Sequence, residues 1–202
     1  MMQRILVLII SLLVTACSEQ VPTMTPLPDN AVILAFGDSL TYGSGVDSDT
    51  ESYPVTLQRL SGRRVINAGK PGEVSQEGVT RLEHLLETLQ PDLVIVCHGG
   101  NDILRRVNKT ALKSNIEKML GSIKNSGAQA VLVGVPAFEF GLSVPALYEQ
   151  LAEQFQIPIE KDALVELQKN SMLKSDQVHL NAQGYAILGQ HIYQLLQQAN
   201  AL

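Results

Sequence analysis

The sequence predicts an α/β domain built on a central parallel sheet of about five strands. Short apolar runs alternate along the chain with stretches of helical periodicity, an order typical of β–α–β units. The apolar runs are continuous rather than alternating, which favours strands covered on both faces. With 202 residues, of which 45% are hydrophobic, the chain is long enough for one such domain.

The expected strands are the apolar runs themselves. The third run ends at Cys97, so we expect that residue to be a buried core thiol. Taken in chain order, the expected strands are residues 31–36, 64–67, 93–97, 130–135 and 157–159.

The expected helices lie between and after these strands. Pro54 suits a first helical turn, and Gly127 provides a stop signal after a stretch with apolar residues at helical spacing. The expected helices are residues 54–60, 76–89, 110–125, 145–155 and 182–199.

The first 17 residues have the features of a targeting segment. Arg4 precedes an apolar run at 5–14, which is too short for a comfortable membrane span and favours a signal peptide. The run ends in Leu-Val-Thr-Ala-Cys17, which resembles a bacterial lipobox, and Ser18 is typical of an outer-membrane lipoprotein. We therefore expect a lipid anchor on Cys17, with a periplasm-facing domain. The alternative is a plain secretory signal cut near Ala16, giving a soluble periplasmic or secreted protein.

Residues 18–30 are polar and contain three prolines, so we expect an extended tether before the domain at 31–202. The net charge is −5, and no basic run follows the first few residues, which argues against nucleic acid as a partner. Lipidation of Cys17 would leave only Cys97 in the domain and so no internal disulfide. We expect a monomer that requires no cofactor.

Polar residues follow the predicted strands, at the edge where parallel sheets bind ligands. Ser39 comes directly after the first strand, in Gly37-Asp38-Ser39-Leu40, where its hydroxyl can be exposed at the start of a helix. A structural capping turn is the alternative. The nucleophile elbow of α/β-hydrolases is disfavoured, because the glycine it needs two residues after the serine is Thr41 here.

Two further segments could bind a negatively charged oxygen. Gly69 follows the second strand and could bring its bare N–H close to a substrate, or could simply allow a loop conformation. Asn101 follows the third strand after two glycines, and its amide could donate to an oxyanion or fix a turn. We expect His98, in the same segment, to pack or hydrogen bond near the site rather than act as the base.

Near the C-terminus, Asp176 and His179 are spaced so that the carboxylate can orient the imidazole, which could then take a proton from Ser39. Helix capping is the alternative for this pair. A metal site is not expected, because His84 and His191 show no spacing that would complete a set of ligands.

Taken together, these segments resemble the four sequence blocks of the GDSL/SGNH hydrolases. The blocks are Gly37-Asp38-Ser39-Leu40, Gly69, Gly100-Asn101-Asp102 and Asp176-Gln177-Val178-His179, and the resemblance spans roughly residues 32–195. Other segments are most similar to the bacterial arylesterase, lysophospholipase and thioesterase I subgroup. The loop Gly69-Lys70-Pro71-Gly72-Glu73 departs from the Ser-Gly-Asp-Thr-like residues expected there. The family pattern therefore does not predict the cap of the following helix or the choice of substrate.

The resemblance implies a three-layer flavodoxin-like fold and hydrolysis of esters or thioesters through an acyl-enzyme. Ser39 would be the nucleophile, with Asp176 and His179 completing the triad. The oxyanion would be bound by the Ser39 and Gly69 N–H groups and the Asn101 side chain.

Three functions remain open from the sequence. An acyl hydrolase acting on fatty acyl esters or thioesters, with a small-molecule ester or a lipid such as a lysophospholipid as substrate, could use the apolar loop at 135–142 as an acyl groove. Ordinary packing after the fourth strand is the alternative for this loop. An O-acetyl esterase acting on envelope or other glycans is the alternative, which the low aromatic content of 4% disfavours. A lipoprotein that kept the fold without the activity is the third.

Overall fold

The computed structural model describes residues 21–138 and 141–202, and its centre is a parallel sheet of five strands in the order β2-β1-β3-β4-β7. The expected α/β class and strand number are confirmed, and the strand order is that of flavodoxin-like sheets. The strands of this sheet are β1 (Val32–Gly37), β2 (Arg64–Gly69), β3 (Leu93–Cys97), β4 (Gln129–Val133) and β7 (Ile159–Glu160).

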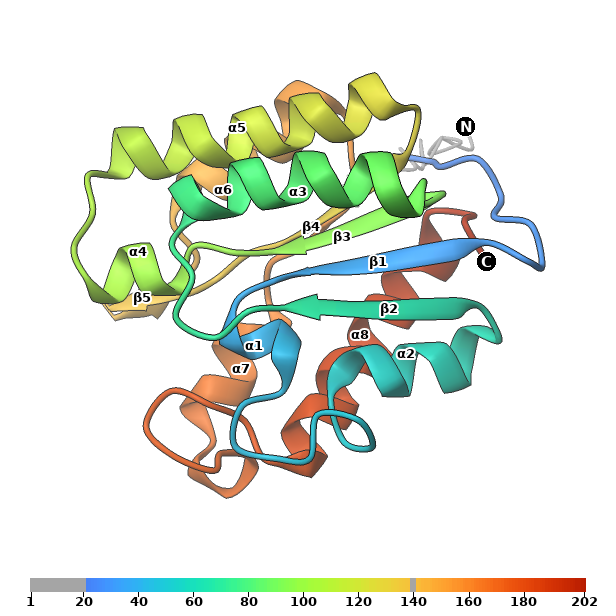
Figure 1. The fold of residues 1–202 in the computed structure, drawn as a ribbon. Helices are drawn as coiled ribbons and strands as arrows, with labels where there is room; N and C mark the ends of the chain where they lie inside the picture. Colours follow the sequence, from blue (N-terminus) through green and yellow to red (C-terminus); the bar gives the residue numbers. More distant parts are fainter. Residues whose placement is uncertain (1–20, 139–140) are drawn as a thin grey trace, which may run out of the picture.

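Helices cover both faces of the sheet and form the two outer layers. Helices α3 and α5 pack together on one face, and α2 and α8 pack together on the other (Figure 1). The longer helices are α2 (Tyr53–Ser61), α3 (Ser75–Leu89), α5 (Lys109–Ser126), α6 (Ala146–Phe155) and α8 (Ala182–Gln198).

The core lies between these layers, as the continuous apolar runs predict. All five residues of β3 are buried, Cys97 included. Burying a single Leu or Ile side chain contributes about 1.5–3 kcal/mol, so the central strands supply much of the stabilisation. Edge strand β2 is less buried, because only one neighbour covers it.

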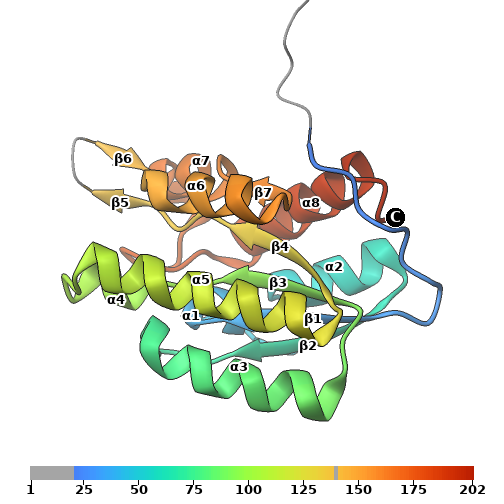
Figure 2. The same cartoon turned by 90° about the horizontal axis from the view of Figure 1, so that it is seen from above.

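Several short elements were not predicted from the sequence. They lie near the carboxyl ends of the strands or in the loops before α8, and Figure 2 shows α4 and the β5–β6 hairpin together at one end of the sheet. These elements are α4 (Gly100–Leu104), β5 (Ala137–Phe138), β6 (Leu142–Ser143), α7 (Ala163–Lys169) and a 3₁₀ turn at Ser171–Leu173. Helix α1 (Ser39–Tyr42), by contrast, is the helix expected to begin at Ser39.

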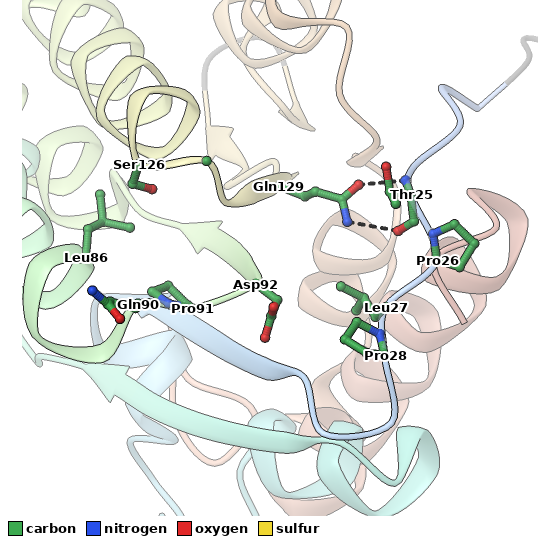
Figure 3. Close-up of a pocket in the computed structure, with 11 residues that line it drawn as sticks. Thr25, Pro26, Leu27, Pro28, Leu86, Gln90, Pro91, Asp92, Ser126 and Gln129 are labelled. Atoms are coloured by element: carbon green, nitrogen blue, oxygen red, sulfur yellow. Dashed lines mark hydrogen bonds between the residues drawn. The ribbon is translucent and has the colours of Figure 1, made fainter.

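Residues 21–30 contain no helix or strand, but they lie against the amino-terminal edge of the sheet. The Thr25 N–H donates to Gln129 Oε1 at 2.7 Å, and Gln129 Nε2 donates to the Thr25 carbonyl at 2.9 Å (Figure 3). Leu27 is buried, and its N–H donates to the Ala201 carbonyl at 2.9 Å. This part of the expected tether is therefore attached to the domain.

The expected signal peptide and Cys17 lie outside the described residues. Within residues 21–138 and 141–202, no helix combines the length and apolar character needed to cross a bilayer.

Candidate active site

Ser39 lies where the chain leaves β1 and starts helix α1. The preceding residue, Asp38, is buried and caps this helix by accepting the Leu40 N–H at 3.1 Å. Its other carboxylate oxygen accepts the Gly100 N–H at 3.1 Å, which joins the ends of β1 and β3. Burial raises the pKa of Asp38. Ser39 is thus placed at the first turn of a helix, whose first N–H groups have no partners within the helix.

The structure brings Ser39, His179 and Asp176 together at the carboxyl edge of the sheet. His179 Nε2 is 3.0 Å from Ser39 Oγ, and His179 Nδ1 is 2.7 Å from Asp176 Oδ2. These are hydrogen-bonding distances, and they make one chain from carboxylate through imidazole to hydroxyl. The juxtaposition expected from the sequence is therefore present.

Asp176 is held by its own loop. Its Oδ1 accepts the Val178 N–H at 2.7 Å and the His179 N–H at 2.8 Å, while the Ser175 N–H donates to the His179 carbonyl at 3.0 Å. Burial raises the pKa of Asp176, but the hydrogen bonds from His179 and Val178 outweigh it and lower the pKa to about 2. The carboxylate is therefore ionised at neutral pH and can stabilise a protonated imidazole.

Asn101 lies in α4, beside the loop that follows β2. One N–H of its side-chain amide donates to the Glu73 carbonyl at 3.0 Å, which fixes the plane of the amide. Gly99 begins the turn with φ of 110°, and a Cβ there would lie 2.5 Å from Tyr148 Oη. Glycine is therefore required at this position both for backbone conformation and for space.

Gly69 is placed at the end of β2, but its N–H already has an acceptor, Asn67 Oδ1 at 3.0 Å. A Cβ at position 69 would lie 2.0 Å from the Tyr42 nitrogen, so close packing against α1 explains the glycine. In the same loop, Gly72 has φ of 80° and no acceptor for its N–H among the described residues. Gly72 directly precedes Glu73, whose carbonyl contacts Asn101.

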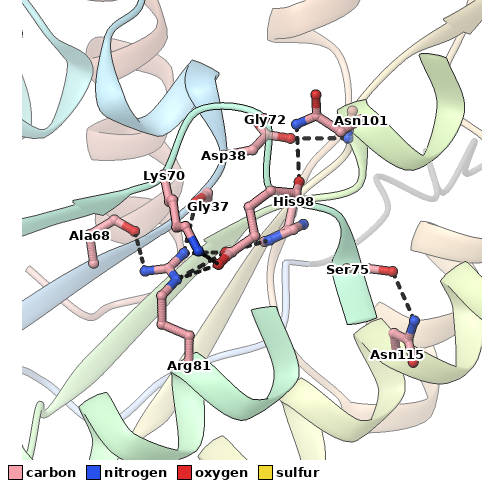
Figure 4. A network of polar contacts seen from close by, with 12 residues as sticks. Gly37, Asp38, Ala68, Lys70, Gly72, Ser75, Arg81, His98, Asn101 and Asn115 are labelled. Carbon is pink, nitrogen blue, oxygen red and sulfur yellow. Dashed lines mark hydrogen bonds and ion pairs between the residues drawn. The ribbon is translucent and has the colours of Figure 1, made fainter. Parts of the chain in front are cut away.

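In the sequence, Glu73 stands out only as part of a loop that departs from the family pattern. In the structure its carboxylate is buried and pairs with Arg81 and His98, both of which are labelled in Figure 4. His98 is fully buried and hydrogen bonded at 3.1 Å to Glu73, which matches the packed or hydrogen-bonded role expected for it. No local pattern links these three residues, because they come from a loop, a helix and the end of a strand.

A mostly apolar cavity of about 90 Å³ opens beside Ser39 and Asn101. Part of the loop at 135–142 lines it, as expected for an acyl site, together with Ile103 and Leu104 of α4. The lining residues from that loop are Val135, Pro136, Ala137 and Leu142. Leu104 remains 62% exposed, so an apolar side chain is available at the cavity mouth.

A nucleophile–imidazole–carboxylate chain at the carboxyl edge of a flavodoxin-like sheet defines a serine hydrolase of the three-layer α/β class. The GDSL-like Lipase/Acylhydrolase family matches residues 35–187, and the chain belongs to this family.

Its relatives include the thioesterase 1/protease 1/lysophospholipase L1 of Escherichia coli (strain K12). That protein is 31% identical over 157 residues, which cover 74% of this chain and 75% of the relative. Among solved structures, TesA matches with a TM-score of 0.74 at 25% identity, covering 83% of this chain and 99% of TesA. The SGNH-hydrolase family esterase AlinE4 matches with a TM-score of 0.64 at 28% identity, covering 87% of this chain and 100% of AlinE4.

Proposed function

We propose that this protein is a serine esterase that hydrolyses acyl esters or thioesters through an acyl-enzyme on Ser39. The observation that carries the proposal is the hydrogen-bonded chain, with 3.0 Å between Ser39 and His179 and 2.7 Å between His179 and Asp176. The names of its relatives, which include thioesterase, lysophospholipase and esterase, support the same reaction class.

In the proposed mechanism, Ser39 Oγ attacks the carbonyl carbon of the substrate while His179 Nε2 takes the hydroxyl proton. Asp176 stabilises the imidazolium that forms. His179 then gives the proton to the leaving alcohol or thiol, and the acyl group stays on Ser39. Water attacks this acyl-enzyme by the same route, which releases the carboxylic acid and restores the Ser39 hydroxyl.

The developing oxyanion would be bound by the Ser39 N–H, the second N–H of the Asn101 side chain and a main-chain N–H from the loop after β2. Gly69 is the donor that the sequence resemblance implies, but it would have to give up its bond to Asn67. The Gly72 N–H has no acceptor among the described residues, and Gly72 directly precedes Glu73, whose carbonyl contacts Asn101. We therefore favour Gly72 for this role.

The apolar cavity supports an acyl group as the part of the substrate that is recognised. Its volume of about 90 Å³ suits a short acyl chain, and exposed Leu104 could extend contact to a longer one. An acyl-length series with p-nitrophenyl esters separates the candidate substrates. Faster turnover of butyryl or hexanoyl than of acetyl esters supports an acyl esterase or lysophospholipase. A clear preference for acetyl would instead favour an O-acetyl esterase acting on glycans.

We further propose that a lipid on Cys17 anchors the protein to the periplasmic face of the outer membrane as a monomer. The segment that precedes β1 lies at the amino-terminal edge of the sheet, whereas α1, which begins at Ser39, follows the carboxyl end of β1 (Figure 1). The anchor would therefore hold the active site away from the bilayer. Mass spectrometry of the N-terminal peptide should detect the lipid, and Cys17→Ser should release the protein from membranes. An unmodified Cys17 would contradict this part of the proposal.

The central experiment compares the wild type with Ser39→Ala and His179→Ala on p-nitrophenyl butyrate. Both variants should lose activity by at least about 10³-fold, because each removes a group that the reaction needs. If Ser39→Ala keeps the activity of the wild type, the proposed mechanism is refuted.

A further inference from the structure

A buried polar cluster lies under the loop that follows β2, and no step of the proposed mechanism uses it. Its members are Glu73, Arg81 and His98, and the Glu73 side chain is only 1% exposed. Arg81 Nε donates to Glu73 Oε1 at 2.8 Å, and His98 Nε2 is 3.1 Å from Glu73 Oε2. Removing charged groups from water costs free energy, so stabilisation of the fold is by itself a weak explanation for a buried cluster of this kind.

Arg81 connects the two strands that end beside the site. Its Nη1 donates to the Ala68 carbonyl of β2 at 2.8 Å, and its Nη2 donates to the Gly37 carbonyl of β1 at 3.1 Å. The guanidinium also lies over the Phe36 ring, 4.2 Å from its centroid. One planar group thus binds both strand ends and the Glu73 carboxylate at the same time. A lysine has a single ammonium and could not reproduce these contacts.

Glu73 connects this cluster to the substrate side of the loop. Its carboxylate faces Arg81 and His98, while its own carbonyl accepts the Asn101 amide at 3.0 Å. That bond leaves the second N–H of the amide for a substrate oxygen. A shift of the loop would move the Glu73 carbonyl and so turn the amide away. Misplacing an oxyanion donor lowers the rate without greatly changing substrate binding.

We propose that Arg81, acting through the buried Glu73 carboxylate, is a positioning residue that sets the Asn101 amide for oxyanion binding. Neither Arg81 nor Glu73 needs to touch the substrate for this role. The inference rests on the proposed esterase function, and it concerns the same site.

A double-mutant cycle between Arg81 and Asn101 tests the proposal, with kcat and KM measured on p-nitrophenyl butyrate. Arg81→Met should lower kcat by about tenfold or more while KM changes by less than about threefold. Asn101→Ala should lower kcat by about 10²-fold, as expected for loss of one oxyanion donor. In the Asn101→Ala background, Arg81→Met should cost less than about twofold, because the donor that it positions is absent.

Arg63→Met is the matched control for this cycle. The Arg63 side chain is 18% exposed against 22% for Arg81, and it also pairs with a carboxylate, Asp29 at 2.9 Å. It lies outside the active site and should leave kcat unchanged in both backgrounds. Arg81→Lys, which keeps the charge and loses the planar fork, should behave like Arg81→Met.

The outcomes separate the possibilities. Equal losses from Arg81→Met in the two backgrounds, or no loss in the wild-type background, would overturn the proposal. If Arg81→Met does not fold, as judged by circular dichroism, Glu73→Gln replaces it in the same cycle with the same expectation of non-additivity. A wild type that neither turns over the ester nor reacts with a fluorophosphonate would instead refute the esterase function itself.

Discussion

Replacing Asp176 by asparagine should lower kcat more than replacing it by alanine. Which variant is slower tests whether the carboxylate acts by setting the tautomer of His179 or by holding the loop. In the structure, Asp176 Oδ1 accepts two loop N–H groups, and Oδ2 faces His179 Nδ1 at 2.7 Å. An asparagine can keep the loop bonds only by placing its oxygen at Oδ1 and its NH₂ toward His179. Because that NH₂ would donate to His179 Nδ1, the neutral imidazole would carry its proton on Nε2. A protonated Nε2 cannot accept the proton of the Ser39 hydroxyl.

The structure limits how large the effect can be. The fall in the pKa of Asp176 from 3.8 to about 2 corresponds to at most about 2.4 kcal/mol, and only part of it comes from His179. Because the side chain is 53% exposed, solvent screening reduces the contribution toward the roughly 1 kcal/mol of an exposed pair. We therefore expect Asp176→Ala to lower kcat by about 5- to 30-fold, far less than a fully buried triad carboxylate would.

Asp176→Asn should be about five- to tenfold slower again, because a net hydrogen bond of about 1 kcal/mol favours the unproductive tautomer. Steady-state kcat on p-nitrophenyl butyrate measures both variants, and thermal unfolding shows whether the loop is intact. If Asp176→Ala is the slower of the two, the carboxylate acts mainly by holding the loop, and the tautomer argument is refuted.

Three further predictions concern stability and reactivity. Burial raises the pKa of Glu73, but the bonds from His98 and Arg81 lower it to about 2. Ionisation of Glu73 should therefore raise the free energy of unfolding by about 3 kcal/mol relative to the protonated carboxyl, an effect present above pH 4.5 and lost as the pH falls toward 2. Urea titrations of the wild type should show this loss, and those of Glu73→Gln should not. Burial raises the pKa of the Cys97 thiol, so a thiol reagent at pH 8 should label it only after unfolding. Gln129→Ala removes two hydrogen bonds to Thr25 and should lower the free energy of unfolding by about 1–2 kcal/mol, with kcat unchanged.

Much of the fold could be predicted because continuous apolar runs report burial directly. The run at 93–97 became β3 with the expected bounds, and the helix expected at 110–125 is α5 at Lys109–Ser126. The short α4 and the two-residue strands β5 and β6 could not be predicted, because contacts with distant segments decide them. Helix α7 had a usable signal in the spacing of Ala163, Leu164 and Leu167, all of which are buried.

The residues of the candidate site that follow strands could be predicted, because the carboxyl ends of parallel strands meet at one edge of the sheet. Ser39 and Asn101 both follow strands of this sheet. The N–H of Gly69 was expected to face the substrate, but whether an N–H is free depends on its neighbours, and Asn67 accepts it in the structure. The Arg81–Glu73 contact was out of reach for the same reason, since it depends on how α3 packs beneath the loop.

The most direct test of the account is a fluorophosphonate probe followed by peptide mapping. The Ser39 hydroxyl lies 3.0 Å from His179 Nε2, which can take its proton, so the phosphonyl adduct should map to Ser39 alone. Labelling should disappear in Ser39→Ala and slow by at least about 10²-fold in His179→Ala. An adduct on another residue, or labelling of Ser39 at the same rate without His179, would contradict the account.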